Sequence, residues 1–212
     1  MTRETRRITH PAGVQSSSLR LYGKRVTLRP LAAQDFESWS EVRNRNGSWL
    51  QPWEPQIPYI SPDPSNNRDA FTNRCAGRDR ERMAGSNFSF GVFIDGVFAG
   101  EINLNNVIRG AMQCGTIGYW IDEARAGNGY IAEAMVLLTR FAFVELHLHR
   151  VEVCIIPRNT NSRRVMEKLE FREEGIALRF LEINGVWEDH VRYGFTTEDW
   201  SMRAEQLTNT WL

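Results

Sequence analysis

The stretch that decides the fold reads Arg-Ala-Gly-Asn-Gly-Tyr-Ile-Ala-Glu-Ala-Met-Val-Leu-Leu-Thr-Arg and spans residues 125–140. Gly127 and Gly129 flank Asn128, so the backbone here can adopt positive φ angles and approach a ligand without a Cβ in the way. From Tyr130 onward, apolar residues recur at helical spacing, namely Ile131, Met135, Leu138 and Phe141. The stretch therefore predicts a glycine turn that leads into an amphipathic helix.

A strand is predicted directly before this turn, because Thr116-Ile117-Gly118-Tyr119-Trp120-Ile121 is rich in β-branched and aromatic residues. A strand, a glycine turn and a helix N-terminus in this order present unpaired N–H groups to an anion, with the helix dipole behind them. The turn has neither the Gly-Lys-Ser/Thr of a P-loop nor the three spaced glycines of a dinucleotide fingerprint. A simple strand-to-helix connection is the alternative to an anion site.

A second segment favours the anion site. Residues 157–171, Pro-Arg-Asn-Thr-Asn-Ser-Arg-Arg-Val-Met-Glu-Lys-Leu-Glu-Phe, directly follow another predicted strand at residues 151–156. Together, the two segments resemble the acyl-CoA-binding core of the GNAT family of N-acetyltransferases. In that family a pyrophosphate loop opens the central helix, and a Pro-x-Asn-x-x-Ser…Glu-Lys-Leu-Gly-Phe stretch follows the next strand. The resemblance implies acetyl-CoA as the co-substrate.

The composition of the 212-residue chain is that of an ordinary soluble globular protein, with 42% apolar and 25% charged residues. Lys and Arg number 26, as do Asp and Glu, so the zero net charge predicts neither nucleic acid nor a membrane as a direct partner. No apolar run approaches the ~20 residues that a bilayer span needs. The three cysteines share no metal-ligand spacing, which predicts no metal and a reducing, cytoplasmic location.

The rest of the chain predicts one domain at residues 19–200, preceded by a disordered basic tail at 1–18 and followed by a C-terminal tail at 201–212. Asp95-Gly96 and Asn184-Gly185 predict two hairpin turns. The proline-rich residues 49–55 predict a stiff loop. Further strands are predicted at 26–29, 88–94, 97–104, 178–184 and 186–195, and further helices at 33–45, 66–83 and 162–169. This order predicts an α+β (α/β three-layer) fold with a mixed, mostly antiparallel sheet flanked by helices, which is the GNAT acyl-CoA N-acyltransferase layout.

Further segments resemble one branch of the GNAT family, whose members acetylate the N-terminal alanine of a ribosomal protein. These segments are residues 49–55, 106–110, 185–191 and 196–200. The chain departs from the general GNAT pattern in two places. The general GNAT loop has Gln or Arg, two residues, Gly, one residue, then Gly or Ala. Aligned on Gly129, its first and last positions are Ala126 and Ile131 in this chain. The helix position that often carries a tyrosine acid is Met166, which cannot donate a proton.

The resemblance implies where acetyl-CoA binds. The pantetheine would lie against the strand at Tyr119, Trp120 and Ile121, mimicking another strand. Asn159 would bind the pantetheine or order its loop, and Ser162 would stabilise or protonate the leaving thiolate. A turn residue is the alternative for Asn159, and a helix cap for Ser162. The pyrophosphate would be held by the backbone of Ala126, Gly127, Asn128, Gly129, Tyr130, Ile131 and Ala132.

The acceptor side is less defined by the sequence. Glu54, Glu101 and Asp189 are candidate bases that act through water, and each has a structural role as its alternative. Neutralising an α-amine at pH 7 costs only about 1 kcal/mol, against roughly 4.6 kcal/mol for a lysine, so a weak base or water alone can serve an N-terminal substrate. The residues expected to form the acceptor wall are Trp49, Trp53, Glu54 and Tyr59.

The sequence therefore predicts direct attack of a protein N-terminal α-amine, belonging to a ribosomal protein that starts with alanine, on acetyl-CoA. An enzyme that acetylates a small amine, such as an amino acid or antibiotic, is a second possible function. A non-catalytic acyl-CoA-binding module is a third. The oligomeric state is left open between monomer and homodimer.

Overall fold

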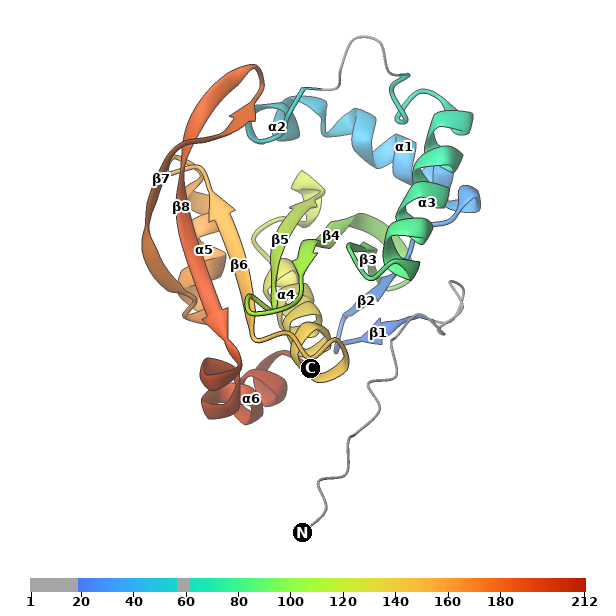
Figure 1. Ribbon diagram of the computed structural model, residues 1–212. Coiled ribbons are helices and arrows are strands. Elements are labelled where there is room, and N and C mark those ends of the chain that lie inside the picture. Colours follow the sequence, from blue (N-terminus) through green and yellow to red (C-terminus); the bar gives the residue numbers. More distant parts are fainter. Residues whose placement is uncertain (1–18, 57–61) are drawn as a thin grey trace.

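The computed structural model describes residues 19–56 and 62–212, so the predicted tail at 1–18 lies outside the described residues. An eight-stranded sheet in the order β1-β2-β3-β4-β5-β6-β8-β7 forms the centre of the molecule (Figure 1). Every neighbouring pair is antiparallel except β5 and β6, which are parallel. The strands are β1 (Leu21–Tyr22), β2 (Val26–Arg29), β3 (Phe88–Ile94), β4 (Val97–Ile108), β5 (Cys114–Ile121), β6 (Arg150–Ile155), β7 (Arg172–Ile183) and β8 (Val186–Thr196).

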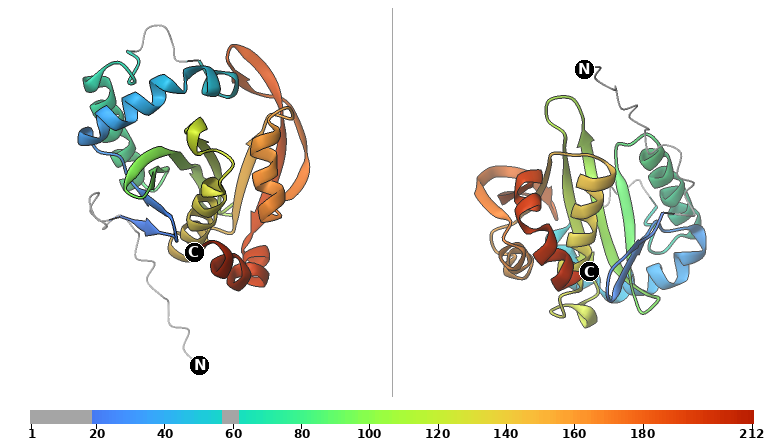
Figure 2. Two further views of the ribbon diagram at one scale, coloured as in Figure 1. Left: turned by 180° about the vertical axis from the view of Figure 1, so that it is seen from behind. Right: turned by 90° about the horizontal axis from the view of Figure 1, so that it is seen from below.

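Helices cover the sheet on two sides (Figure 2). They are α1 (Phe36–Arg45), α2 (Gly47–Leu50), α3 (Arg68–Met83), α4 (Tyr130–Arg140), α5 (Thr160–Leu169) and α6 (Thr197–Trp211). Short 3-10 turns occupy Ala33–Asp35, Gln51–Trp53 (η3) and Glu123–Arg125, and a π-helical turn at Phe141–Glu145 extends α4. No helix within the described ranges is long and apolar enough to cross a bilayer.

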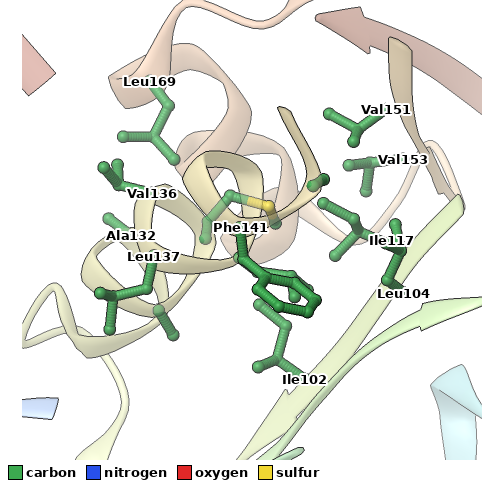
Figure 3. Close-up of a cluster of buried hydrophobic side chains, with 14 of the residues drawn as sticks. Ile102, Leu104, Ile117, Ala132, Val136, Leu137, Phe141, Val151, Val153 and Leu169 are labelled. Carbon is green, nitrogen blue, oxygen red and sulfur yellow. The ribbon is translucent and has the colours of Figure 1, made fainter. Parts of the chain in front are cut away.

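Two hydrophobic cores lie on the opposite faces of the sheet, and β3 shows how its side chains divide between them. Phe90, Val92 and Ile94 belong to the larger core, which also contains α4, while Phe93 belongs to the smaller core with Trp39 of α1. Alternate strand residues point to opposite faces, which explains this division. Figure 3 shows α4 packed on the central strands in the larger core.

The parallel pair β5 and β6 separates along its length. Cys114, Gly115 and Thr116 pair with β6, but the register ends there, and residues 117–121 of β5 have no partner on β6. Their opposite edge remains paired with β4 as far as Ile121. The unpaired part of β5 directly precedes the glycine turn, so the sheet opens where the resemblance implies the pantetheine.

The structure confirms the predicted hairpin at Asp95-Gly96 and the predicted hairpin at Asn184-Gly185, with φ angles of 51° and 79° in the first turn and 47° and 81° in the second. Positive φ at both central residues is the geometry that such sequences favour. The final hairpin is longer than predicted, because β7 begins at Arg172.

Two local predictions need correction. Residues 201–212 were expected as a tail, but most of them belong to α6, with Leu207 buried in the larger core and Trp211 packed against it. The Thr196 side chain and Asp199 form a capping box at the start of this helix. Residues 49–55 were expected as a loop, but α2 and η3 extend into this segment, with proline near the η3 N-terminus, where its missing N–H costs nothing.

Candidate active site

The glycine turn forms an open cradle at the N-terminus of α4. Gly127 and Gly129 adopt φ angles of +78° and +82°, and a Cβ added to Gly127 would meet nothing within 4 Å. The hydrogen bond that closes the first turn runs from Glu133 N to Gly129 O, so the N–H groups of residues 130–132 precede it. An open turn with free N–H groups at a helix N-terminus suits a diphosphate.

The cradle is held by residues that sequence reasoning missed. The Glu133 carboxylate, only 1% exposed, accepts the backbone N–H groups of Arg25 and Val26 at 2.6 and 2.8 Å. The Arg25 guanidinium donates to Glu133 at 3.0 Å and to the carbonyl of Asn128 at 3.1 Å. These bonds tie β2 to the turn, and no local sequence signal indicates them because the partners lie more than a hundred positions apart.

The candidate pantetheine strand is anchored from the α1–α2 side. Trp49 donates its indole N–H to the carbonyl of Ile121 at 3.1 Å, at the end of β5. The Trp120 ring lies 5.0 Å from the Arg43 guanidinium and packs edge-on against Phe98. The three strand residues 119–121 are half-buried.

At the start of α5, Asn159 closes a turn through its backbone N–H to the Ile156 carbonyl at 2.9 Å, and it also caps the helix, which had been the alternative role for Ser162. Asn159 is the N-cap, and its side-chain oxygen accepts the backbone N–H of Ser162 at 3.1 Å. Ser162 is therefore not the cap of this helix, and its hydroxyl instead lies 2.6 Å from the hydroxyl of Tyr119. Met166 is fully buried in the larger core, where it serves packing.

On the acceptor side, Glu54 forms a two-pronged ion pair with Arg43, with both N–O distances at 2.7 Å. Arg158, which lies between β6 and α5, contacts three groups at once. Its guanidinium lies 5.2 Å from the Trp53 ring, binds Glu188 of β8 at 2.9 Å and approaches the carbonyl of Pro52 at 3.4 Å. Tyr59, the remaining expected wall residue, lies outside the described residues.

The structure places the other two candidate bases in structural bonds. Glu101 is 2% exposed, and its oxygens accept Trp39 Nε1 at 2.5 Å and Arg74 at 2.6 Å. Burial alone raises the pKa of Glu101, but the Arg74 charge and these hydrogen bonds outweigh it and hold the pKa below its usual value. Asp189 accepts the backbone N–H of Arg179 at 2.8 Å, where β7 bulges.

No group of three or more His, Cys, Asp or Glu residues able to hold a metal ion occurs in the parts of the chain that the structure describes. Cys75 and Cys114 are buried, and burial raises the pKa of both thiols to about 11. A thiol at that pKa carries almost no thiolate near neutral pH, so these side chains are poor nucleophiles.

The chain belongs to the GNAT acetyltransferase family, because residues 25–172 match the family described as Acetyltransferase (GNAT) domain. The mixed, mostly antiparallel sheet flanked by helices and the glycine turn at the start of the central helix are features that the resemblance predicted. The protein is thus an N-acetyltransferase, and the predicted fold class is confirmed.

The chain is similar to several N-acetyltransferases, one of which is named for a ribosomal protein. The chain is 37% identical to the probable N-acetyltransferase YjcK of Bacillus subtilis, over 80% of this chain and 93% of YjcK. It is 30% identical to the [ribosomal protein uS5]-alanine N-acetyltransferase of Escherichia coli, over 86% and 93% of the two chains. The solved structure of Mycobacterium smegmatis RimJ in complex with CoA-disulfide has a TM-score of 0.78 at 33% identity, over 85% of this chain and 87% of that one.

Proposed function

We propose that this enzyme transfers the acetyl group of acetyl-CoA to the N-terminal α-amine of a protein, specifically a ribosomal protein that begins with alanine. The observation that carries the proposal is the unpaired edge of β5 at residues 117–121, with the glycine cradle at one end and Ser162 beside it through Tyr119. An extended pantetheine arm matches an unpaired strand edge, and its diphosphate matches a helix N-terminus.

Each element of the site has one task in this scheme. The backbone of residues 126–132 would hold the diphosphate, and the edge of β5 would align the pantetheine. Acetyl-CoA supplies an acetyl thioester, which the amine attacks so that a C–N bond forms and the C–S bond breaks. Ser162 would donate a hydrogen bond to the sulfur as it takes the electron pair, and the proton of the amine would leave to water.

The state of the carboxylates supports an α-amine over a lysine as the acceptor. Glu54 and Glu101 are both engaged by arginines, at 2.7 Å and 2.6 Å, and Asp189 holds a backbone N–H. Carboxylates bonded in this way are occupied by their partners, and none of the three is free to take a proton from the amine. An α-amine needs only about 1 kcal/mol to lose its proton at pH 7, whereas a lysine needs roughly 4.6 kcal/mol. Without a dedicated base, an N-terminal α-amine can therefore still be deprotonated at low cost, whereas a lysine side chain cannot.

The acceptor side supports a peptide substrate. Trp53, Glu54 and Arg158 lie between α2 and the β7–β8 hairpin and combine a flat aromatic ring with charges of both signs. Such a surface suits a short polar chain end with a small first side chain. The Escherichia coli relative is named for the alanine of uS5, in agreement with this choice. Action on a ribosomal protein would place the enzyme in the cytoplasm.

An acetylation assay with a panel of short peptides tests the proposal. The peptides share one body and begin with Ala, Ser, Gly, Leu or N-acetyl-alanine, each with an internal lysine, and free amino acids run alongside. Acetylation at the first residue, fastest for alanine and absent from the blocked peptide, is the expected result. Equal rates on free lysine and on the alanine peptide would instead establish a small-amine acetyltransferase.

A further inference from the structure

Two hydroxyl groups meet across the opening in the sheet. Tyr119 lies on the part of β5 that has no partner on β6, and Ser162 lies in the first turn of α5. The Tyr119 hydroxyl oxygen is 2.6 Å from Ser162 Oγ and 3.2 Å from the Ser162 carbonyl oxygen. The contact therefore joins the candidate pantetheine strand to the helix that carries the candidate thiolate ligand.

The direction of the short hydrogen bond follows from the chemistry of its partners. The Tyr119 proton can be donated to Ser162 Oγ at 2.6 Å or to the Ser162 carbonyl oxygen at 3.2 Å. We assign it to the shorter contact, because a phenol is a better donor and a poorer acceptor than an alcohol. Burial raises the pKa of the Tyr119 phenol far above its ordinary value, outweighing the lowering effect of Ser162, and Tyr193 on β8 raises it slightly further. The phenol therefore stays protonated and remains a donor throughout the neutral range.

A donor on one side of Ser162 leaves the serine proton for another acceptor. The backbone N–H of Ser162 is already bound to Asn159 at 3.1 Å, which fixes this turn of α5. With Oγ accepting from Tyr119, the serine O–H points away from Tyr119 and is available to a second acceptor.

We propose that Tyr119 is a positioning residue for acetyl transfer, whose hydroxyl orients the Ser162 hydroxyl so that the serine O–H donates a hydrogen bond to the sulfur of the leaving thiolate. This inference rests on the proposed function for the identity of the leaving group. No proton passes along the pair. The C–S bond breaks with its electrons remaining on sulfur, Ser162 and Tyr119 keep their protons, and the thiolate is protonated by water after release.

The test compares Tyr119→Phe, Ser162→Ala and the double variant with the wild-type enzyme, with Tyr193→Phe as the matched control. Tyr193 is 2% exposed and bonds Arg163 and Glu173 through its hydroxyl, so the control removes a buried phenol oxygen that does not contact Ser162. The first readout is the pKa of the thiol in bound CoA, followed by the ultraviolet absorbance of the thiolate. The second is kcat with acetyl-CoA and an alanine-starting peptide.

Tyr119→Phe should raise the pKa of the bound thiol by about half to one unit, since a hydrogen bond to the thiolate favours the charged form. It should lower kcat by about three- to tenfold, the equivalent of one hydrogen bond, with the KM for acetyl-CoA nearly unchanged. The double variant should be no slower than Ser162→Ala alone, because Tyr119 acts only through Ser162. Tyr193→Phe should leave the thiol pKa in place.

An unchanged thiol pKa in Tyr119→Phe, or losses in kcat that multiply in the double variant, would overturn the proposal. If Tyr119→Phe fails to fold, fluorotyrosine at position 119 retains the ring and makes the hydroxyl a stronger donor. That substitution should lower the thiol pKa, and no change would count against the pair. The thiol measurement needs no acceptor, so a shifted thiol pKa with no peptide acetylation supports the pair and refutes only the proposed acceptor.

Discussion

The backbone N–H of Asn184 donates a hydrogen bond of 2.9 Å to the backbone carbonyl of Glu54, joining the tip of the β7–β8 hairpin to the segment after η3. The residues are 130 positions apart in sequence, and the turn that places Asn184 has positive φ at both Asn184 and Gly185. Figure 1 shows the hairpin curving over toward α2. Together with the Arg158–Glu188 ion pair, this bond forms an arch between the two sides of the acceptor region.

Loosening this arch should weaken acceptor binding without affecting acetyl-CoA. Arg158→Ala removes the Glu188 ion pair and the stacking on Trp53, and we expect the KM for an alanine-starting peptide to rise about fivefold. Arg164→Ala, an exposed arginine on α5, is the control for the lost charge. Steady-state kinetics and calorimetry with CoA measure the two effects. A rise in the CoA dissociation constant with an unchanged peptide KM would contradict this assignment.

Removing the aromatic wall should have a larger effect on the peptide. Trp53→Ala deletes the ring under Arg158, and we expect the peptide KM to rise about tenfold while CoA affinity stays near normal. Trp187→Ala is the matched control, since this tryptophan lies on β8 of the β7–β8 hairpin beside the acceptor region and is 61% exposed. Equal effects of the two substitutions on peptide KM would show that Trp53 has no special place in the acceptor site.

Glu54→Gln tests the negative charge that follows Trp53 in the acceptor region. The change leaves Arg43 without its two-pronged carboxylate partner, which should lower the free energy of unfolding by about 1 kcal/mol. If Glu54 also attracts the protonated amine, the peptide KM rises several-fold and the rise shrinks at high salt. Kinetics at two ionic strengths check this. A loss of stability with no change in peptide KM would assign Glu54 to structure alone.

The glycine cradle is best tested at Gly127. Gly129 is a poor choice, because a Cβ added there would lie 3.2 Å from Trp211 and would disturb packing as well as binding. Gly127→Ala should weaken CoA binding about five- to tenfold, since its methyl group enters the space that a diphosphate approaches. Gly96→Ala is the control, with φ at +79° against +78° and open space at both. Both variants should lose about 1 kcal/mol of stability, but calorimetry should find weaker CoA binding only in Gly127→Ala.

The Ser162 hydroxyl should matter to the chemical step. Ser162→Ala should lower kcat by about ten- to a hundredfold with little change in the KM for acetyl-CoA, because charge develops on sulfur mainly in the transition state. Since Asn159 and not Ser162 caps α5, thermal stability should change little. A variant with normal kcat would remove Ser162 from the mechanism.

Glu101 should contribute to stability in a pH-dependent manner. Its folded pKa lies below the ordinary 4.5, so the stability it provides is complete above pH 4.5 and is lost as the pH falls through the lowered folded value. Glu101→Gln should therefore cost about 1–3 kcal/mol near pH 7 and less in acid. Melting temperatures of the wild type and Glu101→Gln, measured from neutral to acidic pH, give this contribution to stability. Glu41→Gln, at an exposed position, is the control. A changed pH–rate profile in Glu101→Gln would identify Glu101 as a base instead.

Local sequence determined much of the fold. The dipeptides Asp95-Gly96 and Asn184-Gly185 determined both hairpin turns because their short side chains tolerate positive φ. The apolar spacing after Tyr130 predicted the helix α4 but predicted it as amphipathic, whereas every residue from Ile131 to Thr139 is buried. The sequence signal for α6 is the capping box of Thr196 and Asp199, which the predicted tail at 201–212 did not take into account.

The sequence by itself thus determined the strand, the glycine turn and the helix that make a GNAT core, since each depends on contacts between residues a few positions apart. Only the tertiary structure decided which side chains meet: Tyr119 with Ser162, Glu133 with Arg25, and Arg158 with Trp53. It also decided that Glu101 is bound by Trp39 and Arg74. These pairings depend on how distant elements pack against one another, and neither side-chain periodicity nor turn chemistry along the chain carries that information.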